Sequence, residues 1–254
     1  MVLTPERMQV SLRRRMRWPL LIAPRWCESK KCGKPLDKHG DHRAACMRTG
    51  RVRRRAKPLE KTWARVFREA GGRVQENVFL KHMGIPGVPA SDGRRIEVLA
   101  TGLPLERGIP MAVDATLVSP LHADGTAWAK ADTVAGTSIA RGETDKRRTY
   151  PELVHSPLVK LTTMACEVGG RWSQQCVRIV KELAWARARS APRVLQLATY
   201  HAFAARWWAL LSCAQQDCLA ASLLDDGLAL LDGCDGAEPA LTDVLLDNAY
   251  GAES

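Results

Sequence analysis

The stretch "RRIEVLATGLPLERGIPMAVDATLVS", residues 94–119, contains two strand patterns joined by a short connection. In its second half, residues 109–119, apolar side chains alternate with Asp114 and Thr116, so that the two kinds point to opposite faces of a strand. In its first half, residues 94–102 have glycine on both sides, and "LPLERG" can form a hairpin turn between the halves. The stretch therefore predicts two neighbouring strands of one sheet.

Helix and strand patterns continue on both sides of this stretch. An apolar stripe of Leu59, Trp63, Val66, Phe67 and Ala70 predicts a helix that stops at Gly71-Gly72. Further elements are expected as strands at 73–80 and 158–170, a loop over 122–145, a short helix within 145–153 that ends before Pro151, and helices over 173–190 and about 193–224. The order predicts an α/β (α+β) fold in which a mixed sheet carries helices on its faces. The predicted core spans 55–190, followed by a separate C-terminal helix at 191–224.

The charge of the chain is unevenly distributed. The formal net charge is +11, but residues 225–254 contain eight acidic side chains and no Lys or Arg, which leaves +19 on the other 224 residues. Such a surplus favours a polyanionic partner, through release of counterions from phosphates. A solvated basic surface without a partner, or a basic scaffold, would need only this charge. Residues 1–26 are interpreted as a basic arm and 225–254 as an acidic, weakly ordered tail.

The cysteines and the apolar runs indicate in which cellular compartment the protein is expected. Eight cysteines without a secretory leader indicate reduced thiols, so the chain is not expected to be secreted. No apolar run reaches the 18 or more residues of a membrane span, and no membrane association is expected.

A polar segment at 27–50 concentrates thiols and imidazoles. Cys27, Cys32, His42 and Cys46 offer sulfur and nitrogen ligands that can complete a tetrahedron around Zn²⁺. His39 competes with His42, and His42 is preferred because of its spacing to Cys46. Since the segment has little apolar content, a structural zinc would replace a core. An accidental cluster is the alternative.

Two carboxylates, Glu97 and Asp114, interrupt the apolar strand patterns. A buried carboxylate needs a partner or a metal, and two that converge can hold Mg²⁺. Lys146 and Tyr150 share one face of the predicted helix at 145–153, so the lysine could steady a phosphate or a water. The alternatives are an ion pair of Glu97 with a neighbouring arginine, a structural role for Asp114, and a solvated turn at Lys146.

Four motifs together resemble the restriction-like endonuclease domain, of PD-(D/E)xK type, at the C-terminal end of non-LTR retrotransposon polyproteins. They are the zinc segment "CGKPLDKHGDHRAAC", "RRIEVLATGLP", "AVDATLVS" and "KRRTY", and the resemblance covers about residues 27–185. It implies a restriction-endonuclease-like fold preceded by a zinc knuckle, a DNA (possibly RNA) substrate, nuclear localisation and an upstream reverse transcriptase in the intact polyprotein.

The resemblance also implies roles for individual residues. Glu97 and Asp114 occupy the two acidic positions, although the family usually has Asp at the first. The usual lysine position holds Thr116, and Lys146 with Tyr150 fits the displaced lysine of the retroelement branch. Glu60 would be the helix glutamate that assists metal binding. The residues expected to contact nucleic acid are Arg53, Arg54, Arg55, Arg94, Arg95, Arg147, Arg148 and Arg171.

The sequence thus favours a Mg²⁺-dependent DNA endonuclease that hydrolyses a phosphodiester. The rival hypothesis is a zinc-containing module that binds nucleic acid but has lost catalysis, and the departures at Glu97 and Thr116 support it.

Overall fold

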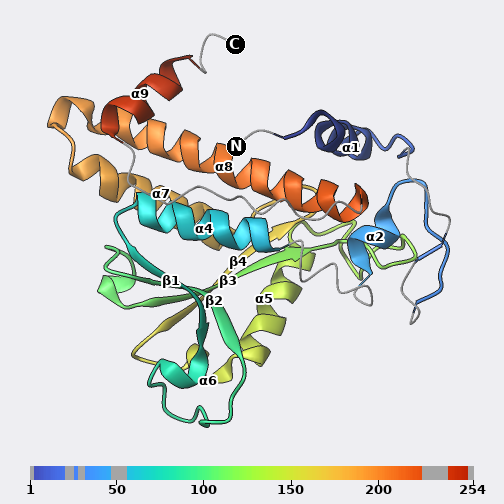
Figure 1. Ribbon diagram of the computed structural model, residues 1–254, viewed down its shortest axis with the longest axis horizontal. Helices are drawn as coiled ribbons and strands as arrows, with labels where there is room; N and C mark the ends of the chain where they lie inside the picture. Colours follow the sequence, from blue (N-terminus) through green and yellow to red (C-terminus); the bar gives the residue numbers. More distant parts are fainter. Residues whose placement is uncertain (1–2, 21–25, 28–31, 47–55, 225–239, 251–254) are drawn as a thin grey trace.

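A computed structural model of the chain describes residues 3–20, 26–27, 32–46, 56–224 and 240–250 (Figure 1). A four-stranded sheet in the order β1-β2-β3-β4 lies at its centre. The strands are β1 (Arg73–Phe79), β2 (Arg95–Thr101), β3 (Met111–Val118) and β4 (Lys160–Glu167). Neighbouring strands pair antiparallel from β1 to β3, whereas β3 and β4 pair parallel. The mixed sheet flanked by helices confirms the predicted α+β class.

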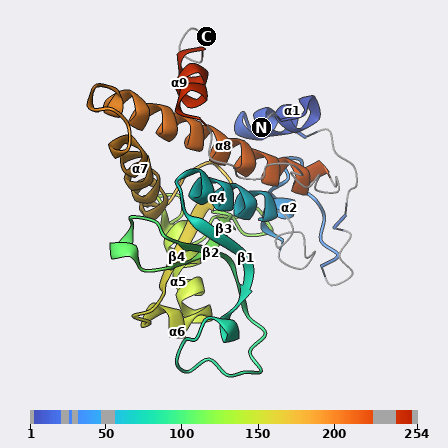
Figure 2. The same ribbon diagram turned by 60° about the vertical axis from the view of Figure 1, so that its left-hand side comes forward.

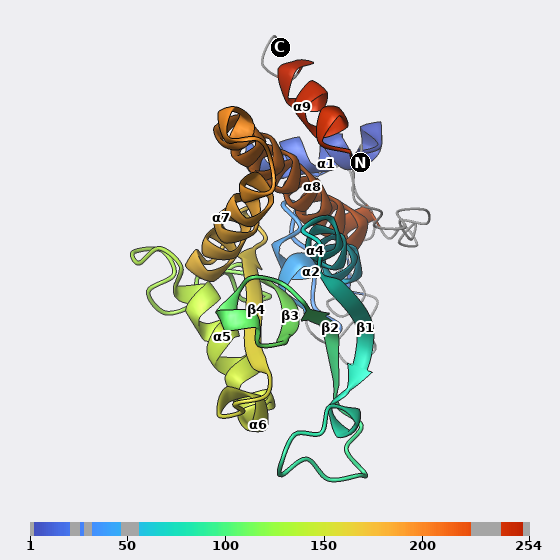
Figure 3. The same ribbon diagram turned by 90° about the vertical axis from the view of Figure 1, so that its left-hand side faces the viewer.

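The helices lie on both faces of this sheet. Figure 3 shows α5 (Thr137–Thr149) and α6 (Pro151–Val154) on one side, and α4 (Lys57–Glu69), α7 (Gln174–Arg189) and α8 (Gln196–Leu224) on the other. Among the described residues, the remaining helices are α1 (Pro5–Arg15), α2 (Asp41–Ala45) and α9 (Leu241–Tyr250), with single 3₁₀ turns at Leu80–His82, Glu106–Gly108 and Arg193–Leu195. In the described residues, no helix combines the length and apolarity needed to cross a membrane.

The larger core fills the face under α4, α7 and α8. The predicted stripe of α4 is buried there, with Trp63 stacked against Phe67 at a ring-centroid distance of 5.8 Å. Glu69, at the end of the same helix, is 1% exposed and accepts hydrogen bonds from Arg206 and from the Trp207 indole N–H. These bonds satisfy a buried carboxylate and fix α4 on α8. A smaller core around Leu80, Ile96, Tyr150 and Leu153 lies on the other face.

The N-terminal segment is not a free arm. Its residues 5–15 form α1, which packs along α8 (Figure 2). Arg7 forms an ion pair of 2.5 Å with Asp217 of α8, and both side chains are less than 10% exposed. Residues 5–15 have no apolar stripe to predict a helix; their local signals are the N-cap Thr4 and Pro5, and Arg7 and Val10 are buried in the folded chain.

Two further boundaries differ from the sequence prediction. The helix α8 is not a separate appendage, because Trp207, Leu211 and Ala214 are fully buried in the main core. The acidic segment holds α9, whose Val244 is 1% exposed against the same core, while 225–239 and 251–254 lie outside the described residues. The predicted loop at 122–145 also ends early, since α5 begins at Thr137.

Candidate functional site

The register of β2 on β3 brings the two predicted carboxylates together. Val98 pairs with Val113 at the end of this ladder, and one further step places Glu97 opposite Asp114. Beyond Val98, a side-chain hydrogen bond connects the two strands: Glu97 Oε2 accepts a hydrogen bond of 2.5 Å from the Ala115 N–H. The two carboxylates therefore lie side by side on the sheet, which is the juxtaposition expected from the sequence.

Lys146 neutralises the deeper of these two carboxylates. The Asp114 side chain is 1% exposed, and the Lys146 Nζ lies 2.8 Å from each of its oxygens. Thr116, which stands at the usual position of the motif lysine, donates a hydrogen bond of 2.9 Å to Asp114 Oδ1. The ammonium is thus supplied by Lys146 of α5. Thr116, two residues after Asp114 on β3, supplies a neutral hydrogen-bond donor instead.

A third carboxylate, Glu60, comes from the first turn of α4. Burial and the charge of Asp114 raise the pKa of Glu97 to about 9 and that of Glu60 to about 7. A hydrogen bond with Glu97 acts in the opposite sense and lowers the pKa of Glu60. Burial first, and the charge of Asp114 second, thus favour the protonated form of both glutamates, in Glu60 up to about pH 7.

Tyr150 lies next to Asp114 and Glu97, between this cluster and the smaller core. Its hydroxyl donates a hydrogen bond of 3.0 Å to the Arg95 carbonyl, and its ring belongs to the smaller core. Burial and the charges of Asp114 and Glu97 raise the pKa of its hydroxyl, so it stays protonated at neutral pH. Tyr150 therefore acts as a neutral hydrogen-bond donor at this site.

Helix α5 reaches the sheet because Gly142 lets it approach closely. A Cβ at Gly142 would lie 2.8 Å from Val118 Cγ1 of β3. Only a residue without a side chain permits this approach, and one further turn of the helix carries Lys146 to Asp114.

The predicted zinc ligands also converge. One ligand atom from each of Cys27, Cys32, His42 and Cys46 lies within 4.8 Å of the others, and within the described residues this quartet is the one such group of His, Cys, Asp or Glu. His42 Nδ1 lies 2.7 Å from the Ala123 carbonyl oxygen and donates to it, which leaves the lone pair of Nε2 toward Cys32 Sγ at 3.5 Å. This arrangement of the imidazole is the usual one for a metal-bound histidine. The quartet can hold a metal ion such as zinc.

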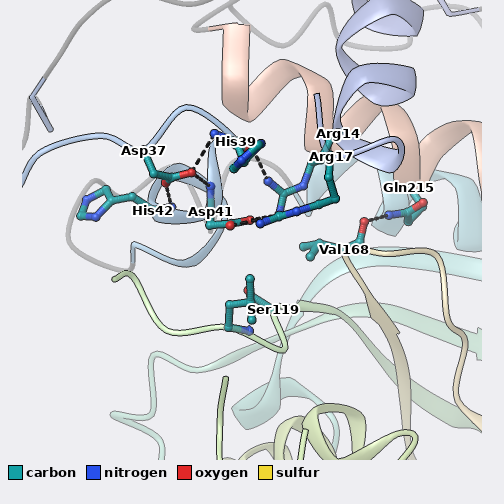
Figure 4. Close-up of polar contacts among 10 residues, drawn as sticks. Arg14, Arg17, Asp37, His39, Asp41, His42, Ser119, Val168 and Gln215 are labelled. Atoms are coloured by element: carbon teal, nitrogen blue, oxygen red, sulfur yellow. Dashed lines mark hydrogen bonds and ion pairs between the residues drawn. The ribbon is translucent and has the colours of Figure 1, made fainter. Parts of the chain in front are cut away.

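Hydrogen bonds within the segment prepare this geometry. The Asp37 carboxylate accepts from the backbone N–H groups of His39, Asp41 and His42, which begins α2 (Figure 4). The His39 side chain stays outside the quartet, as expected. Buried Asp41 forms ion pairs of 3.0–3.1 Å with Arg14 and Arg17, which join the zinc segment to the residues around the end of α1.

One cleft of about 1350 Å³ connects the two clusters. Cys32 and Cys46 of the zinc segment line it, as do Glu60, Glu97 and Lys146. The cleft is also lined by Lys34, Lys57, Arg94, Arg95, Arg141 and Asp145. Among its described charged lining residues, lysines and arginines therefore outnumber acids six to three.

The predicted nucleic-acid contacts are placed unequally. Arg95 lines the cleft and lies over the Phe79 ring at 4.0 Å, whereas Arg94 is held by Asp92, Glu152 and the Thr149 carbonyl. The exposed side chains of Arg147, Arg148 and Arg171 lie outside the cleft, with Arg171 3.3 Å from Glu167. Arg53, Arg54 and Arg55 lie outside the described residues.

Three cleft residues were missed by the sequence prediction: His122, Trp128 and Arg141. They lie in the segment interpreted as a small, polar loop. In the sequence, the one sign that this segment has a role in the site was Trp128, which stands among small residues.

The comparisons with known proteins place the chain in no family: no family model matches it, and no curated protein matches it significantly.

Proposed function

We propose that the chain is a divalent-metal-dependent DNA endonuclease, related to the restriction-like domains of non-LTR retrotransposons. The observation that carries the proposal is the convergence of Glu60, Glu97 and Asp114, from three different elements, at Lys146 in a basic cleft. Burial and mutual repulsion oppose the ionisation of all three carboxyl groups, and a divalent cation would supply the charge that lets them ionise.

The donor set suits Mg²⁺. Carboxylate oxygens are the ligands that this ion prefers, and an incomplete protein shell leaves positions for water. When bound by Glu97 and Asp114, the ion would lower the pKa of a water ligand and offset charge on the phosphate. Its binding would release the proton of Glu97.

The residues of the chain supply the remaining functions. Glu60, with a pKa near 7, is suited to take a proton from the attacking water at neutral pH. The Lys146 side chain is 28% exposed in the cleft, so its ammonium can stabilise the charge that develops on the phosphate. Tyr150 holds the β2 backbone at Arg95 and so keeps Glu97 in position.

Zinc has a structural part in this proposal. A zinc ion bound to Cys27, Cys32, His42 and Cys46 would fix the wall of the cleft opposite the acidic cluster, because His42 also binds the Ala123 carbonyl. The upstream reverse transcriptase and nuclear localisation belong to the same proposal, through the family resemblance.

Nicking of supercoiled plasmid DNA tests the proposal. Wild-type protein should convert the plasmid to open circles with Mg²⁺ but not with Ca²⁺, and Asp114→Asn should lower the rate by at least ~10³-fold, which corresponds to the loss of several kcal/mol of transition-state stabilisation. Glu76→Gln, which alters an exposed carboxylate on β1, is the matched control and should cleave normally. Equal rates for Asp114→Asn and wild type would refute the proposal.

A second candidate function follows from Thr116. Because this residue cannot supply the motif ammonium and Lys146 is engaged with Asp114, a zinc-containing DNA-binding module without catalysis is the alternative. DNA binding without cleavage in both Mg²⁺ and Mn²⁺ would favour that function.

A further inference from the structure

The segment between β3 and α5 builds a stack of three side chains in the wall of the cleft. Within it, Leu121 and Ala127 form an antiparallel β-bridge, and the His122 N–H donates a hydrogen bond to the Thr126 carbonyl oxygen. The chain therefore doubles back and places His122 beside Trp128. The ring centroids of these two residues are 3.5 Å apart. On the Trp128 ring also lies the Arg141 guanidinium, with Cζ 3.4 Å from the centroid. Two groups at these distances cannot share one face of the indole, so Trp128 is held between His122 and Arg141.

The guanidinium of Arg141 is held in place, but within the described part of the chain no direct ion pair neutralises it. Its Nη1 is buried and has no hydrogen-bond partner among the described residues. The charge of Asp145 acts on it, but desolvation is the larger effect and lowers the pKa of the guanidinium. Buried donors of this kind are normally satisfied, so the Arg141 guanidinium retains a donor that the described residues do not use.

The position of Arg141 relates it to the acidic cluster. On β3, Thr116 and Val118 follow Asp114 on the same face and contact Gly142, the neighbour of Arg141. Arg141 thus lies between the Lys146 site and the zinc quartet, and both arginine and lysine line the same cleft. Arg141 and Lys146 are five residues apart in α5, which corresponds to ~7.5 Å along the helix axis.

We infer that Arg141, stacked on Trp128, is a phosphate-binding residue that holds the DNA strand between the acidic cluster and the zinc segment. This inference rests on the proposed function for the identity of the ligand. Arginine suits the role because its planar fork keeps its donors at the edge while its face stacks on an aromatic ring. The stack limits the freedom of the guanidinium before DNA arrives, so less entropy is lost on binding.

The zinc segment supports this phosphate site indirectly. His42 donates to the Ala123 carbonyl, which directly follows His122. The segment that carries His122 and Trp128 is therefore attached to a ligand of the zinc quartet, and His122 acts as a positioning residue for the stack.

Binding of duplex DNA, measured without cleavage, tests the inference. Fluorescence anisotropy of a fluorescein-labelled duplex, without added divalent cation, gives Kd and its dependence on salt. Each phosphate contact contributes about 0.9 to the slope of log K against log [salt]. Arg141→Gln should raise Kd by ~10-fold near 0.1 M salt and reduce the slope by about 0.9.

Two further variants make the test specific. Arg178→Gln removes an exposed charge on α7 that is paired with Glu106 and Glu182, and both Kd and slope should match wild type. Arg141→Lys keeps the charge but not the planar fork, so it should restore the slope and only part of the affinity. Thermal melting confirms that each variant is folded.

The inference is wrong if Arg141→Gln and Arg178→Gln give the same Kd and the same slope, because the stack would then serve only to pack the segment. If Arg141→Gln weakens binding as expected but wild type does not cleave DNA in Mg²⁺, the phosphate site stands and the endonuclease proposal fails.

Discussion

Lys146 Nζ lies 2.8 Å from both carboxylate oxygens of Asp114, beneath a cleft that Glu60 and Glu97 also line. The pair joins α5 to β3 and leaves Lys57, which also lines the cleft, as the other lysine whose charge acts on Glu60. The proposed chemistry depends on this relationship, because the three carboxyl groups can all be ionised only when a further cation is bound.

Replacing Lys146 tests the pair energetically. Lys146→Gln leaves a buried carboxylate without its counter-charge and should lower the free energy of unfolding by ~1–3 kcal/mol, a value reduced for the partial exposure of the lysine. The double variant Asp114→Asn/Lys146→Gln should recover most of that loss. Urea denaturation at neutral pH measures both.

Lys160→Gln, at an exposed position at the start of β4, is the control for the loss of one positive charge. If Lys146→Gln is no less stable than Lys160→Gln, the ammonium does not stabilise Asp114.

The raised pKa values of Glu97 and Glu60 predict how stability depends on pH. Both groups have an ordinary pKa of 4.5, and in the folded chain the values are about 9 and about 7. Between these limits the folded state binds more protons than the unfolded state, so stability without divalent cation falls as pH rises from about 5 to about 9. Glu97→Gln should flatten this profile and raise stability near pH 9 by ~1–3 kcal/mol.

Urea midpoints at three pH values, with Glu76→Gln as the control, measure the effect. Parallel profiles for wild type and Glu97→Gln would contradict the assignment of the proton to Glu97.

Metal analysis separates the two histidines of the zinc segment. Wild type and His39→Ala should retain about one zinc per chain, whereas His42→Ala should lose it and melt at least ~5 °C lower, because the segment has little other core. Elemental analysis of the purified proteins, together with calorimetry, provides both readouts. Full zinc content in His42→Ala would exclude this histidine as a ligand.

The close approach at Gly142 predicts an unusual effect of alanine. Alanine favours a helix more than glycine does, yet Gly142→Ala should destabilise the protein by ~1–3 kcal/mol, because its Cβ would lie 2.8 Å from Val118 Cγ1 and push α5 from the sheet. Cleavage should fall as well, since Lys146 moves with the helix. Gly169→Ala, where a Cβ would have no atom within 4 Å, should leave both stability and cleavage close to wild type. A stabilised Gly142→Ala would show that the contact is easily relieved.

The parts of the fold that the sequence predicted are those with a local signal. Strand β3 was predicted because apolar and polar residues alternate over residues 111–117. Helix α4 was predicted because Leu59, Trp63 and Phe67 recur at helical spacing. The N-cap Ser173 likewise marked the start of α7. Local periodicity was sufficient in each case.

The parts that were missed depend on distant partners. Helix α1 has Arg7 paired with Asp217, 210 residues away, and no pattern in residues 1–26 reveals this contact. The stack of Arg141 on Trp128 requires the turn at 121–127 and the docking of α5 through Gly142. Among the site residues, Asp114 and the zinc ligands were visible from spacing, whereas Glu60 was named only through the family resemblance.

The most direct test of the central claim is the position of a divalent cation in crystals of the protein soaked in Mn²⁺. The account predicts an anomalous-difference peak about 2.0–2.2 Å from carboxylate oxygens of Glu97 and Asp114, and its loss in Asp114→Asn crystals. A map that shows Mn²⁺ elsewhere, with the Lys146 ammonium still between the two oxygens of Asp114, would contradict it.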